Sequence, residues 1–349
     1  HTRLQGDWSS DVCSSDLRNI ITACAIVLFI LAVPFFQRAP KAPLAVLIAA
    51  ALGASSVVHY RQGFANPCDK ESNYFCLRVV DVSTQAPFGN AKALILDHLL
   101  HSMNHESEPA MLLSPYVQLM DELVLNHFEP ESLSTLEYFF AGGGAYTQPR
   151  AIHARTPDAR LVVSELDREV TKIAQRELFV STERMEVFHR DARTVLHSLR
   201  DARFDVVVTD AFHDIAVPYH LVTREFAQLV KARMKPNGLF VTNIVDAFPD
   251  PKMVKSLTKT LQQEFQHVDI WLDDIPQRHQ RMTYVISASN REIIDDTLDA
   301  QQGFARRWYR INTPLMSVGT PMHELPIFTD DFVPVERMIA GLLFTAEGL

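Results

Sequence analysis

The sequence predicts an α/β fold in which a parallel sheet is covered by helices on both faces. Three observations support this prediction. From about residue 136 onward, short apolar segments alternate with amphipathic helical segments, which is typical of parallel strands buried on both faces. Three consecutive glycines follow the first of these strands, in a chain with only 12 glycines. An acidic residue ends the next strand, about 20 residues later.

Length and composition limit the classes of protein that this chain can be. Its 349 residues leave room for two domains, since one domain takes ~150 residues. Hydrophobic residues make up 47% and charged residues 21%, which excludes disorder over most of the length. A formal net charge of −9 argues against broad electrostatic capture of nucleic acid. Four cysteines in so long a chain exclude a disulfide-framework miniprotein.

Residues 1–17 (HTRLQGDWSSDVCSSDL) are expected to lie outside the fold. They are rich in Ser and Asp, have no hydrophobic period and join abruptly to an apolar stretch. They resemble translated sequencing-adapter read-through, a non-native scar to be excluded from fold reasoning. On this interpretation the natural N-terminus is missing and further protein is expected upstream. The alternative is a natural disordered tail.

Two apolar segments follow, Ile20–Phe36 and Ala42–Val58, each 17 residues long and free of charge. A membrane span needs about 20 apolar residues, with ~17 as the short limit. We therefore expect residues 18–60 to form two transmembrane helices, joined by a tight turn that carries Arg38 and Lys41. The alternative is a buried core hairpin. Positive charge lies at both ends of the hairpin, so the positive-inside bias barely decides its orientation.

Cys68 and Cys76 flank the start of the next region. In an oxidising compartment they would pair, and in the cytosol they would stay reduced. The sequence favours unpaired thiols and leaves a disulfide as the alternative. No His or second Cys pair accompanies them, so their spacing is a weak signal for a metal.

A small β-stranded region is predicted over residues 68–118. The runs Phe75–Val82 and Ala91–Asp97 are apolar or β-branched and are split by Pro and Gly, which predicts antiparallel strands. A larger domain is predicted over residues 119–349, and apolar spacing indicates that it begins with the helix Leu119–His127.

Strands and helices then alternate along the larger domain. Apolar runs predict strands over Leu136–Phe140, Leu161–Ser164, Met185–Phe188, Phe204–Thr209, Leu239–Ile244, Val268–Trp271 and Met282–Ser287. Helical spacing predicts helices over Arg168–Leu178, Arg193–Leu199, Leu221–Met234 and Met253–Phe265. The turn residues Pro236, Asn237 and Gly238 separate the third of these helices from the following strand.

The run Gly142-Gly143-Gly144 is the first candidate for chemistry. Glycines after the first strand let the backbone turn tightly and approach a ligand closely. The second strand ends at Glu165, where a carboxylate is placed to accept hydrogen bonds from ribose hydroxyls. Together these signals favour an adenosine-containing ligand. The alternatives are a plain tight turn for the glycines and a helix N-cap for the acid, a role that suits Asp167 better.

Further acidic residues follow the third and fourth strands. Asp191 is placed either to reach an adenine amino group or to cap the next helix, and the sequence leaves both roles open. Asp210 ends the fourth strand and faces the crevice where such sheets bind ligands. A carboxylate in this loop can orient and deprotonate an attacking amine, and Asp214 follows four residues later.

The motifs GGGAY, VVSELD, HRDAR and VVVTDAFHDIAVPYHLVTREF, in this order and spacing, resemble the polyamine (spermidine/spermine) synthase family. The resemblance runs from about Glu71 to Ala288. It implies a Rossmann-like sheet of the S-adenosylmethionine-methyltransferase type, preceded by a small β-stranded domain. The apolar N-terminus and TDDFVPVE (Thr329–Glu336) resemble a membrane-embedded branch of this family.

The resemblance also implies roles for single residues. Gly142, Gly143 and Gly144 would approach the nucleotide. Glu165 would hold the ribose hydroxyls, and Asp191 would hold the adenine. Two acids would serve catalysis, Asp210 as the base for the attacking amine and Asp214 as the second acid of its loop. Four residues would line the amine site: Asp97, His101, Tyr116 and Tyr219.

The chain departs from the family pattern mainly in the amine half. Ala145 stands where the family has an acid after the third glycine, and the loop after Asp210 is one residue longer. His98 replaces a glycine and His101 a glutamine, and Val117 stands where a glutamine follows the lining tyrosine. A dicationic substrate needs several carboxylates, and part of that set is missing.

His98, His101 and His105 would share one face if the segment were helical, which invites a metal interpretation. No matching carboxylate accompanies them, so we expect no metal and place these residues at the altered substrate pocket.

The leading interpretation is an aminopropyltransferase, in which an amine attacks the carbon beside the sulfonium of decarboxylated S-adenosylmethionine. The alternatives are an S-adenosylmethionine-dependent methyltransferase and a non-catalytic nucleotide-sensing domain of a membrane protein. The donor is a cytosolic metabolite, so the domain is expected on the cytoplasmic side of a membrane. A Cys68–Cys76 disulfide would argue against that side. A homo-oligomer is left open.

Overall fold

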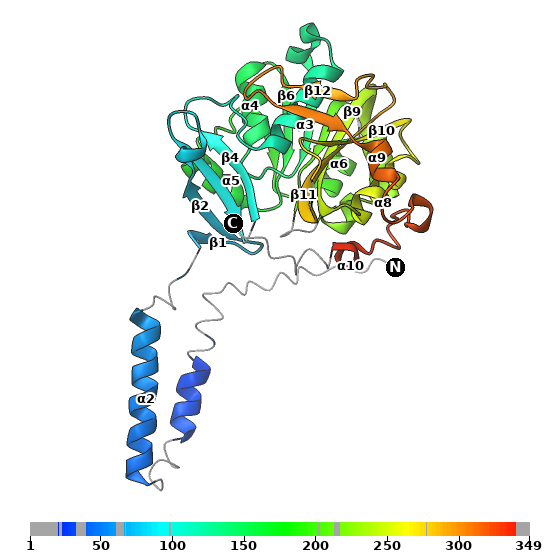
Figure 1. Cartoon of the computed structure of the whole chain (residues 1–349). Coiled ribbons are helices and arrows are strands. Elements are labelled where there is room, and N and C mark those ends of the chain that lie inside the picture. Colours follow the sequence, from blue (N-terminus) through cyan, green and yellow to red (C-terminus); the bar gives the residue numbers. More distant parts are fainter. Residues whose placement is uncertain are drawn as a thin grey trace. The chain divides into compact units, whose positions relative to one another are not determined.

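The computed structural model describes residues 20, 23–32, 40–60, 66, 68–97, 99–200, 203–212, 217–276 and 278–339. The chain divides into two compact units, residues 1–78 and residues 79–349 (Figure 1). Residues 1–17 lie outside the described residues. The domain boundaries predicted from the sequence stay predictions.

The first unit contains the long helix α2 (Lys41–Tyr60), and residues 23–32 are also helical. Among the described residues, no helix is long and apolar enough to cross a membrane. The predicted pair of transmembrane helices is therefore not confirmed. The apolar run of α2 is interrupted by Gly53, Ser55 and Ser56, and residues 33–39 of the other segment lie outside the described residues.

A disulfide joins Cys68 to Cys76. Cys68 lies two residues before β1 (Lys70–Glu71), and Cys76 is the first residue of β2 (Cys76–Asp81); the antiparallel pairing of these strands brings the two Cα atoms within 5.2 Å. The preference for unpaired thiols was therefore wrong, because antiparallel pairing places side chains that are eight residues apart next to each other.

A four-stranded sheet has the order β1-β2-β3-β4. β3 (Ala91–Leu96) agrees with the prediction, whereas β4 (Leu99–His105) was not predicted as a strand. Leu96 pairs with Leu99, and Asp97, which follows β3, adopts a left-handed conformation. Because β4 is extended, the helical spacing considered for the histidines does not apply.

The second sheet has nine strands in the order β12-β13-β10-β11-β9-β8-β5-β6-β7. Its strands β9, β8, β5, β6 and β7 are parallel neighbours. The bounds of these five strands are β5 Glu137–Ala141, β6 Arg160–Ser164, β7 Met185–Phe188, β8 Phe204–Thr209 and β9 Met234–Phe248. β7 and β8 coincide with the predicted strands. β9 is longer than the predicted strand. It pairs with β8 at Met234 and again from Leu239 onward, and the predicted turn residues lie in the register shift between these two pairs.

The other half of this sheet is antiparallel. The bounds of its strands are β10 His267–Leu272, β11 Gln280–Ser289, β12 Thr297–Asp299 and β13 Arg307–Arg310. β11 pairs antiparallel with β9, and β10 pairs antiparallel with β11 and β13. The prediction of a parallel sheet therefore holds for the five strands from β9 to β7 and is wrong for the antiparallel half, because an apolar run does not encode the direction of its partner strand.

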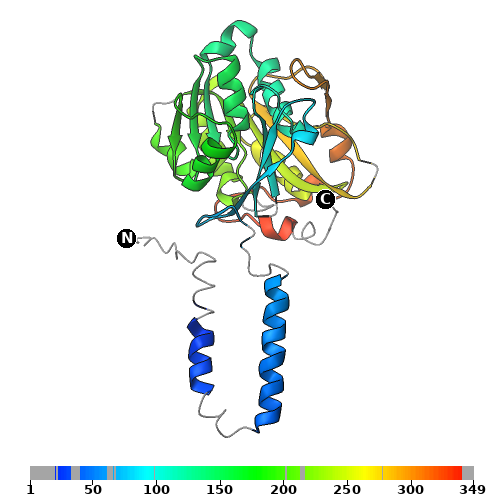
Figure 2. The ribbon, with the colours of Figure 1, turned by 90° about the vertical axis from the view of Figure 1, so that its left-hand side faces the viewer.

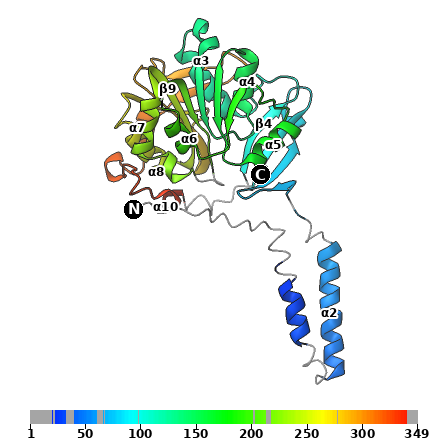
Figure 3. The ribbon, with the colours of Figure 1, turned by 180° about the vertical axis from the view of Figure 1, so that it is seen from behind.

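Helices cover both faces of the large sheet, as predicted (Figure 3). On one face, α6 (Ala192–Ser198), α7 (Arg224–Arg233) and α8 (Lys252–Leu261) pack on the strands and enclose the main core. On the other face, α3 (Pro115–His127) packs on β9 and β11. The remaining helices are α4 Thr147–Arg155, α5 Arg168–Glu177, α9 Asn312–Met316 and α10 Val335–Ile339, with short 3-10 turns η1 Ser83–Gln85, η2 Pro130–Thr135, η3 Tyr219–Leu221 and η4 Met322–Glu324.

Helix α8 holds the C-terminal segment. The Nζ of Lys255 is fully buried and donates to the carbonyls of Val318 and Thr320, and it pairs with Asp250 Oδ1 at 3.3 Å. Asp250 also accepts from the backbone N of Thr320 at 2.8 Å. One turn later, Lys259 Nζ donates to the carbonyls of residues 322 and 325 at 2.9 and 2.6 Å. These contacts fix the chain that leads to Thr329–Glu336.

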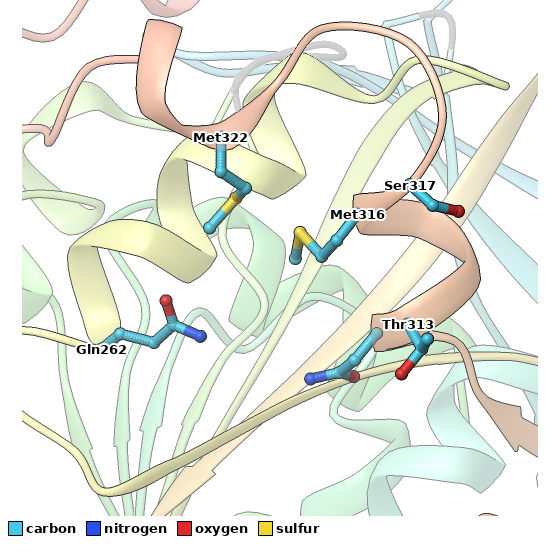
Figure 4. A pocket seen from close by; sticks show the side chains of 6 residues that line it. Gln262, Thr313, Met316, Ser317 and Met322 are labelled. Atoms are coloured by element: carbon cyan, nitrogen blue, oxygen red, sulfur yellow. The ribbon is translucent and has the colours of Figure 1, made fainter.

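A hollow of 460 Å³ lies between the end of α8 and α9 (Figure 4). Met316 and Met322 both line it, and Asn312, which also lines it, forms hydrogen bonds with β10. The hollow is open and carries no charged side chain in its lining.

We predict that Lys255→Met lowers the free energy of unfolding by about 3 kcal/mol, because it leaves two carbonyls and Asp250 without their buried cation. Lys252→Met is the matched control, since Lys252 is exposed and lies 3.9 Å from the same carboxylate; it should cost less than about 1 kcal/mol. Equilibrium unfolding in urea measures both. Equal losses in the two variants would contradict the role given to Lys255.

Candidate active site

The carboxyl ends of the parallel strands meet at one edge of the large sheet. There the backbone N of Gly142 donates to Ser164 O at 2.9 Å, and the N of Asp210 donates to Ala141 O at 3.0 Å. The N of Glu165 donates to Phe188 O at 2.9 Å. The segments after β5, β6, β7 and β8 therefore lie side by side, at the edge where open α/β sheets bind ligands.

Gly142 is required by the close approach of two backbones. Its φ is +100°, and a Cβ at this position would lie 2.2 Å from the carbonyl O of Asp210. At Gly143 a Cβ would meet the ring of Tyr146 at 2.9 Å. Gly144 is different, because the nearest atom to its Cβ position is Ser102 Oγ at 3.9 Å. The glycine run is thus more than a plain turn, and Gly144 borders open space.

Glu165 lies under the glycine loop. Its Oε2 accepts from the backbone N of Gly143 at 2.8 Å and of Gly144 at 3.2 Å, and its Oε1 accepts from Asp167 N at 2.8 Å. Burial raises the pKa of Glu165 although these three bonds oppose the shift. The carboxylate therefore fixes the loop. Asp167 caps α5 by accepting from Glu169 N at 2.9 Å, as predicted.

Asp210 is a partly buried acid with two side-chain partners. The hydroxyl of Tyr116, which has a single proton, lies 3.5 Å from Asp210 Oδ2 and 2.6 Å from His101 O, so the two oxygens share its donated hydrogen bond. Asn243, on β9, also donates to the carboxylate. Burial raises the pKa of Asp210 to about 6, against both of these hydrogen bonds, which lower it. At neutral pH the group is a carboxylate whose proton affinity suits a general base.

Strand β4 of the small sheet, drawn in cyan in Figure 2, contacts the segment after the glycine run through Asn104. Asn104 Nδ2 donates to Ala145 O at 2.8 Å and to Leu178 O at 3.0 Å, while its Oδ1 accepts from Thr147 Oγ1 at 2.7 Å. Arg150 donates to the carbonyl of His105 at 2.8 Å. Counted from Gly142, Thr147 stands where the dinucleotide-binding pattern G-x-G-x-x-G has its third glycine, and here it instead donates to Asn104.

Asp191 is engaged by the protein on both sides. Its Oδ1 caps α6 by accepting from Thr194 N at 2.8 Å, and its Oδ2 lies 2.6 Å from His220 Nε2. Burial would raise the pKa of Asp191, but the bonds from His220 and Thr194 outweigh it and bring the pKa to about 2. Arg193 connects this region to the C-terminal segment through a two-bond pair with Asp330 at 2.7 and 2.6 Å.

The residues predicted to line an amine site divide into two groups. His101 and Tyr116 join Asp210 through the contacts of the tyrosine hydroxyl, and the charge of Asp97 acts on His101. Tyr219, in η3, is 57% exposed and contacts His220 edge to face. Asp214 and His98 lie outside the described residues.

In the part of the chain that the structure describes, no group of three or more His, Cys, Asp or Glu side chains is arranged to hold a metal. His105 is occupied by other contacts, because its Nε2 lies 2.6 Å from Phe88 O and its Nδ1 accepts from Glu108 N at 3.1 Å.

Asn243, Asn104 and the pairing of His220 with Asp191 were not predicted from the sequence. Both asparagines are almost fully buried in strands, with exposed fractions of 2% and 1%. A lone amide within an apolar strand is a signal that could have found them, because buried polar groups need partners.

Comparison with known proteins shows which families this chain resembles. Residues 159–297 match the spermine/spermidine synthase domain. Thermospermine synthase ACAULIS5 of Arabidopsis thaliana is 26% identical over 214 residues, which cover 58% of this chain and 60% of that protein. A polyamine aminopropyltransferase of Vibrio vulnificus is 30% identical over 132 residues, which cover 37% of this chain and 42% of that protein. The chain thus spans about half the length of these curated relatives.

The crystal structure of a probable spermidine synthase from Corynebacterium glutamicum superposes with a TM-score of 0.60 at 19% identity, covering 74% of this chain and 98% of that one. This likeness establishes the α/β Rossmann-like fold. The resemblance predicted from the motifs is supported for the synthase domain, and these comparisons do not bear on the membrane-embedded branch.

We predict that the Asp210 carboxyl titrates near pH 6, and that Tyr116→Phe moves this midpoint to higher pH, because the lost hydroxyl no longer stabilises the carboxylate. NMR of carboxyl-13C aspartate, assigned with Asp210→Asn, measures the titration. Tyr284→Phe is the control, since its buried hydroxyl has no hydrogen-bond partner and lies near Asp246. An unchanged midpoint in Tyr116→Phe would contradict the hydrogen bond.

Proposed function

We propose that this chain transfers an aminopropyl group from a decarboxylated S-adenosylmethionine-type donor to an amine. The observation that carries the proposal is Asp210, an acid at the end of β8 whose pKa burial raises to about 6 and which Tyr116 and Asn243 orient. The match to the spermine/spermidine synthase domain supports the same reaction class.

The glycine loop and its neighbours form the donor half of the proposed site. Gly144 borders open space and leaves room for a ligand close to the backbone. Glu165 holds the loop through its Oε2, which accepts two backbone N–H bonds, whereas its Oε1 accepts only from Asp167 N and keeps a lone pair with which to accept a ribose hydroxyl. Asp191 could accept a hydrogen bond from the adenine amino group only if its Oδ2 gave up the contact with His220. The ribose assignment is therefore the stronger of the two.

In the proposed step, the nitrogen of the acceptor amine attacks the aminopropyl carbon bound to the sulfonium. A C–N bond forms as the C–S bond breaks, and the electron pair of that bond neutralises the sulfur, which leaves as methylthioadenosine. The proton of the amine passes to a carboxylate oxygen of Asp210. Tyr116 and Asn243 fix that carboxylate, so that its free lone pairs have a defined direction.

We predict that Asp210→Asn lowers kcat by roughly 10²–10⁴-fold, the scale for loss of a general base, and changes donor binding far less. Mass spectrometry measures the products formed from decarboxylated and intact S-adenosylmethionine with a panel of amines. Asp299→Asn, at an exposed ion pair with Arg307 on β12 and β13, is the control.

The same experiment separates the alternatives. Methylthioadenosine supports aminopropyl transfer, adenosylhomocysteine supports a methyltransferase, and binding without turnover supports a nucleotide sensor. Full activity in Asp210→Asn would refute its role as the base.

We also propose that the N-terminal helices attach the chain to a membrane, with the synthase-like unit on the cytoplasmic side. Apolar side chains along them are widely exposed, as at Phe29 (66%) and Val46 (68%), and the donor is a cytosolic metabolite. The Cys68–Cys76 disulfide weighs against the cytoplasmic side, because such bonds persist in oxidising compartments.

Labelling of thiols in permeabilised cells tests the side of the membrane. A cytoplasmic unit predicts that Cys68 and Cys76 react without prior reduction. Reaction only after reduction would place the unit in an oxidising compartment and overturn the assignment. Recovery of a chain without residues 20–60 in the membrane fraction would contradict the attachment.

A further inference from the structure

His101 is the extra residue of a β-bulge beside the candidate base. Leu94 pairs with Ser102, and Ile95 pairs with Leu100, so His101 has no partner on β3. Bulges occur next to active sites, where they redirect one side chain and interrupt the ladder. The interruption leaves the carbonyl of His101 free, and it accepts from Tyr116 Oη at 2.6 Å. His101 is thereby connected to Asp210 through a single hydroxyl group.

The imidazole of His101 is buried and has an unused nitrogen. Its exposed fraction is 8%, and its Nε2 has no hydrogen-bond partner. Its ring lies edge to face with Phe212, two residues after Asp210, at a centroid distance of 6.4 Å. By contrast, both ring nitrogens of His105 on the same strand are occupied. A buried polar atom without a partner costs free energy, so it calls for a ligand group.

We propose that Nε2 of His101 is the hydrogen-bond partner of the distal polar group of the acceptor amine, and that this distal group is uncharged. This inference rests on the proposed aminopropyl transfer. It assigns the reacting nitrogen to Asp210 and acceptor selectivity to His101.

The surroundings of His101 favour an uncharged group. Burial lowers the pKa of His101 to about 4, although the charge of Asp97 opposes the shift. The charge of Asp97 therefore does not offset the cost of burying a protonated imidazole at this position. A second ammonium of the substrate, placed against the ring, would also lose its hydration on burial and would gain only the attraction of Asp97 in return. A hydroxyl carries no charge and would need only the hydrogen bond.

The test compares three acceptors with decarboxylated S-adenosylmethionine: 4-aminobutan-1-ol, butylamine and putrescine. We expect kcat/KM for the amino alcohol to exceed that for butylamine by about tenfold, the scale of one hydrogen bond. His101→Phe and the smaller His101→Leu should both reduce this ratio to about one. His101→Gln, which keeps a neutral hydrogen-bonding group, should retain most of it. His197→Phe, at an exposed site on α6, is the control for the substitution itself.

Calorimetric titration of the same amines into the protein with methylthioadenosine present separates this inference from the proposed reaction. One outcome is that the protein binds the amino alcohol selectively, that His101→Phe abolishes this selectivity, and that no methylthioadenosine is produced in turnover. This outcome would sustain the inference and reject the reaction. Product formation with an unchanged ratio in the Phe and Leu variants would overturn the inference and leave the reaction standing. Preference for putrescine over the amino alcohol, or no binding of any of the three amines, would also overturn it.

Discussion

The close contact between Gly142 and the main chain of Asp210 is the constraint on which the candidate site depends. A side chain at residue 142 would collide with the Asp210 carbonyl, so the loop after β5 can cross the end of β8 only as glycine. In this crossing the loop lies against the main chain of Asp210, and Glu165 holds it by accepting from the backbone N of Gly143 and Gly144. Asn104 then holds the far side of the loop by its bonds to Ala145 and Thr147.

Four buried or partly buried acids have different roles, because their hydrogen-bond partners and positions in the fold differ. Glu165 and Asp191 are held by backbone N–H groups and a histidine, and they stabilise the loop and a helix end. Asp246 has a pKa raised to about 7 by burial, but the backbone N–H groups of Ala247 on β9 and Val254 in α8 occupy it. Asp210 combines a raised pKa with side-chain partners at the open edge of the sheet. Its position, more than its pKa, marks it as the candidate base.

The small sheet takes part in the site through a single strand. β4 supplies the bulged His101 and the carbonyl that Tyr116 binds, and three residues later it supplies Asn104. One strand therefore reaches the acceptor side and the glycine loop together. A shift of β4 by one residue would turn both sets of side chains to the other face, so the bulge and its register connect the geometry of the two halves.

The sequence by itself determined the repeating strand-and-helix pattern, the bounds of β7 and β8, the glycine loop and the acids at the strand ends. Apolar period, glycine spacing and N-cap chemistry are local, and a single sequence displays them. The antiparallel half of the sheet, the disulfide, the bulge at His101 and the partners of Asp210 were decided only by the tertiary structure. Strand direction, register and burial depend on residues far away in the chain, so no local pattern contains them.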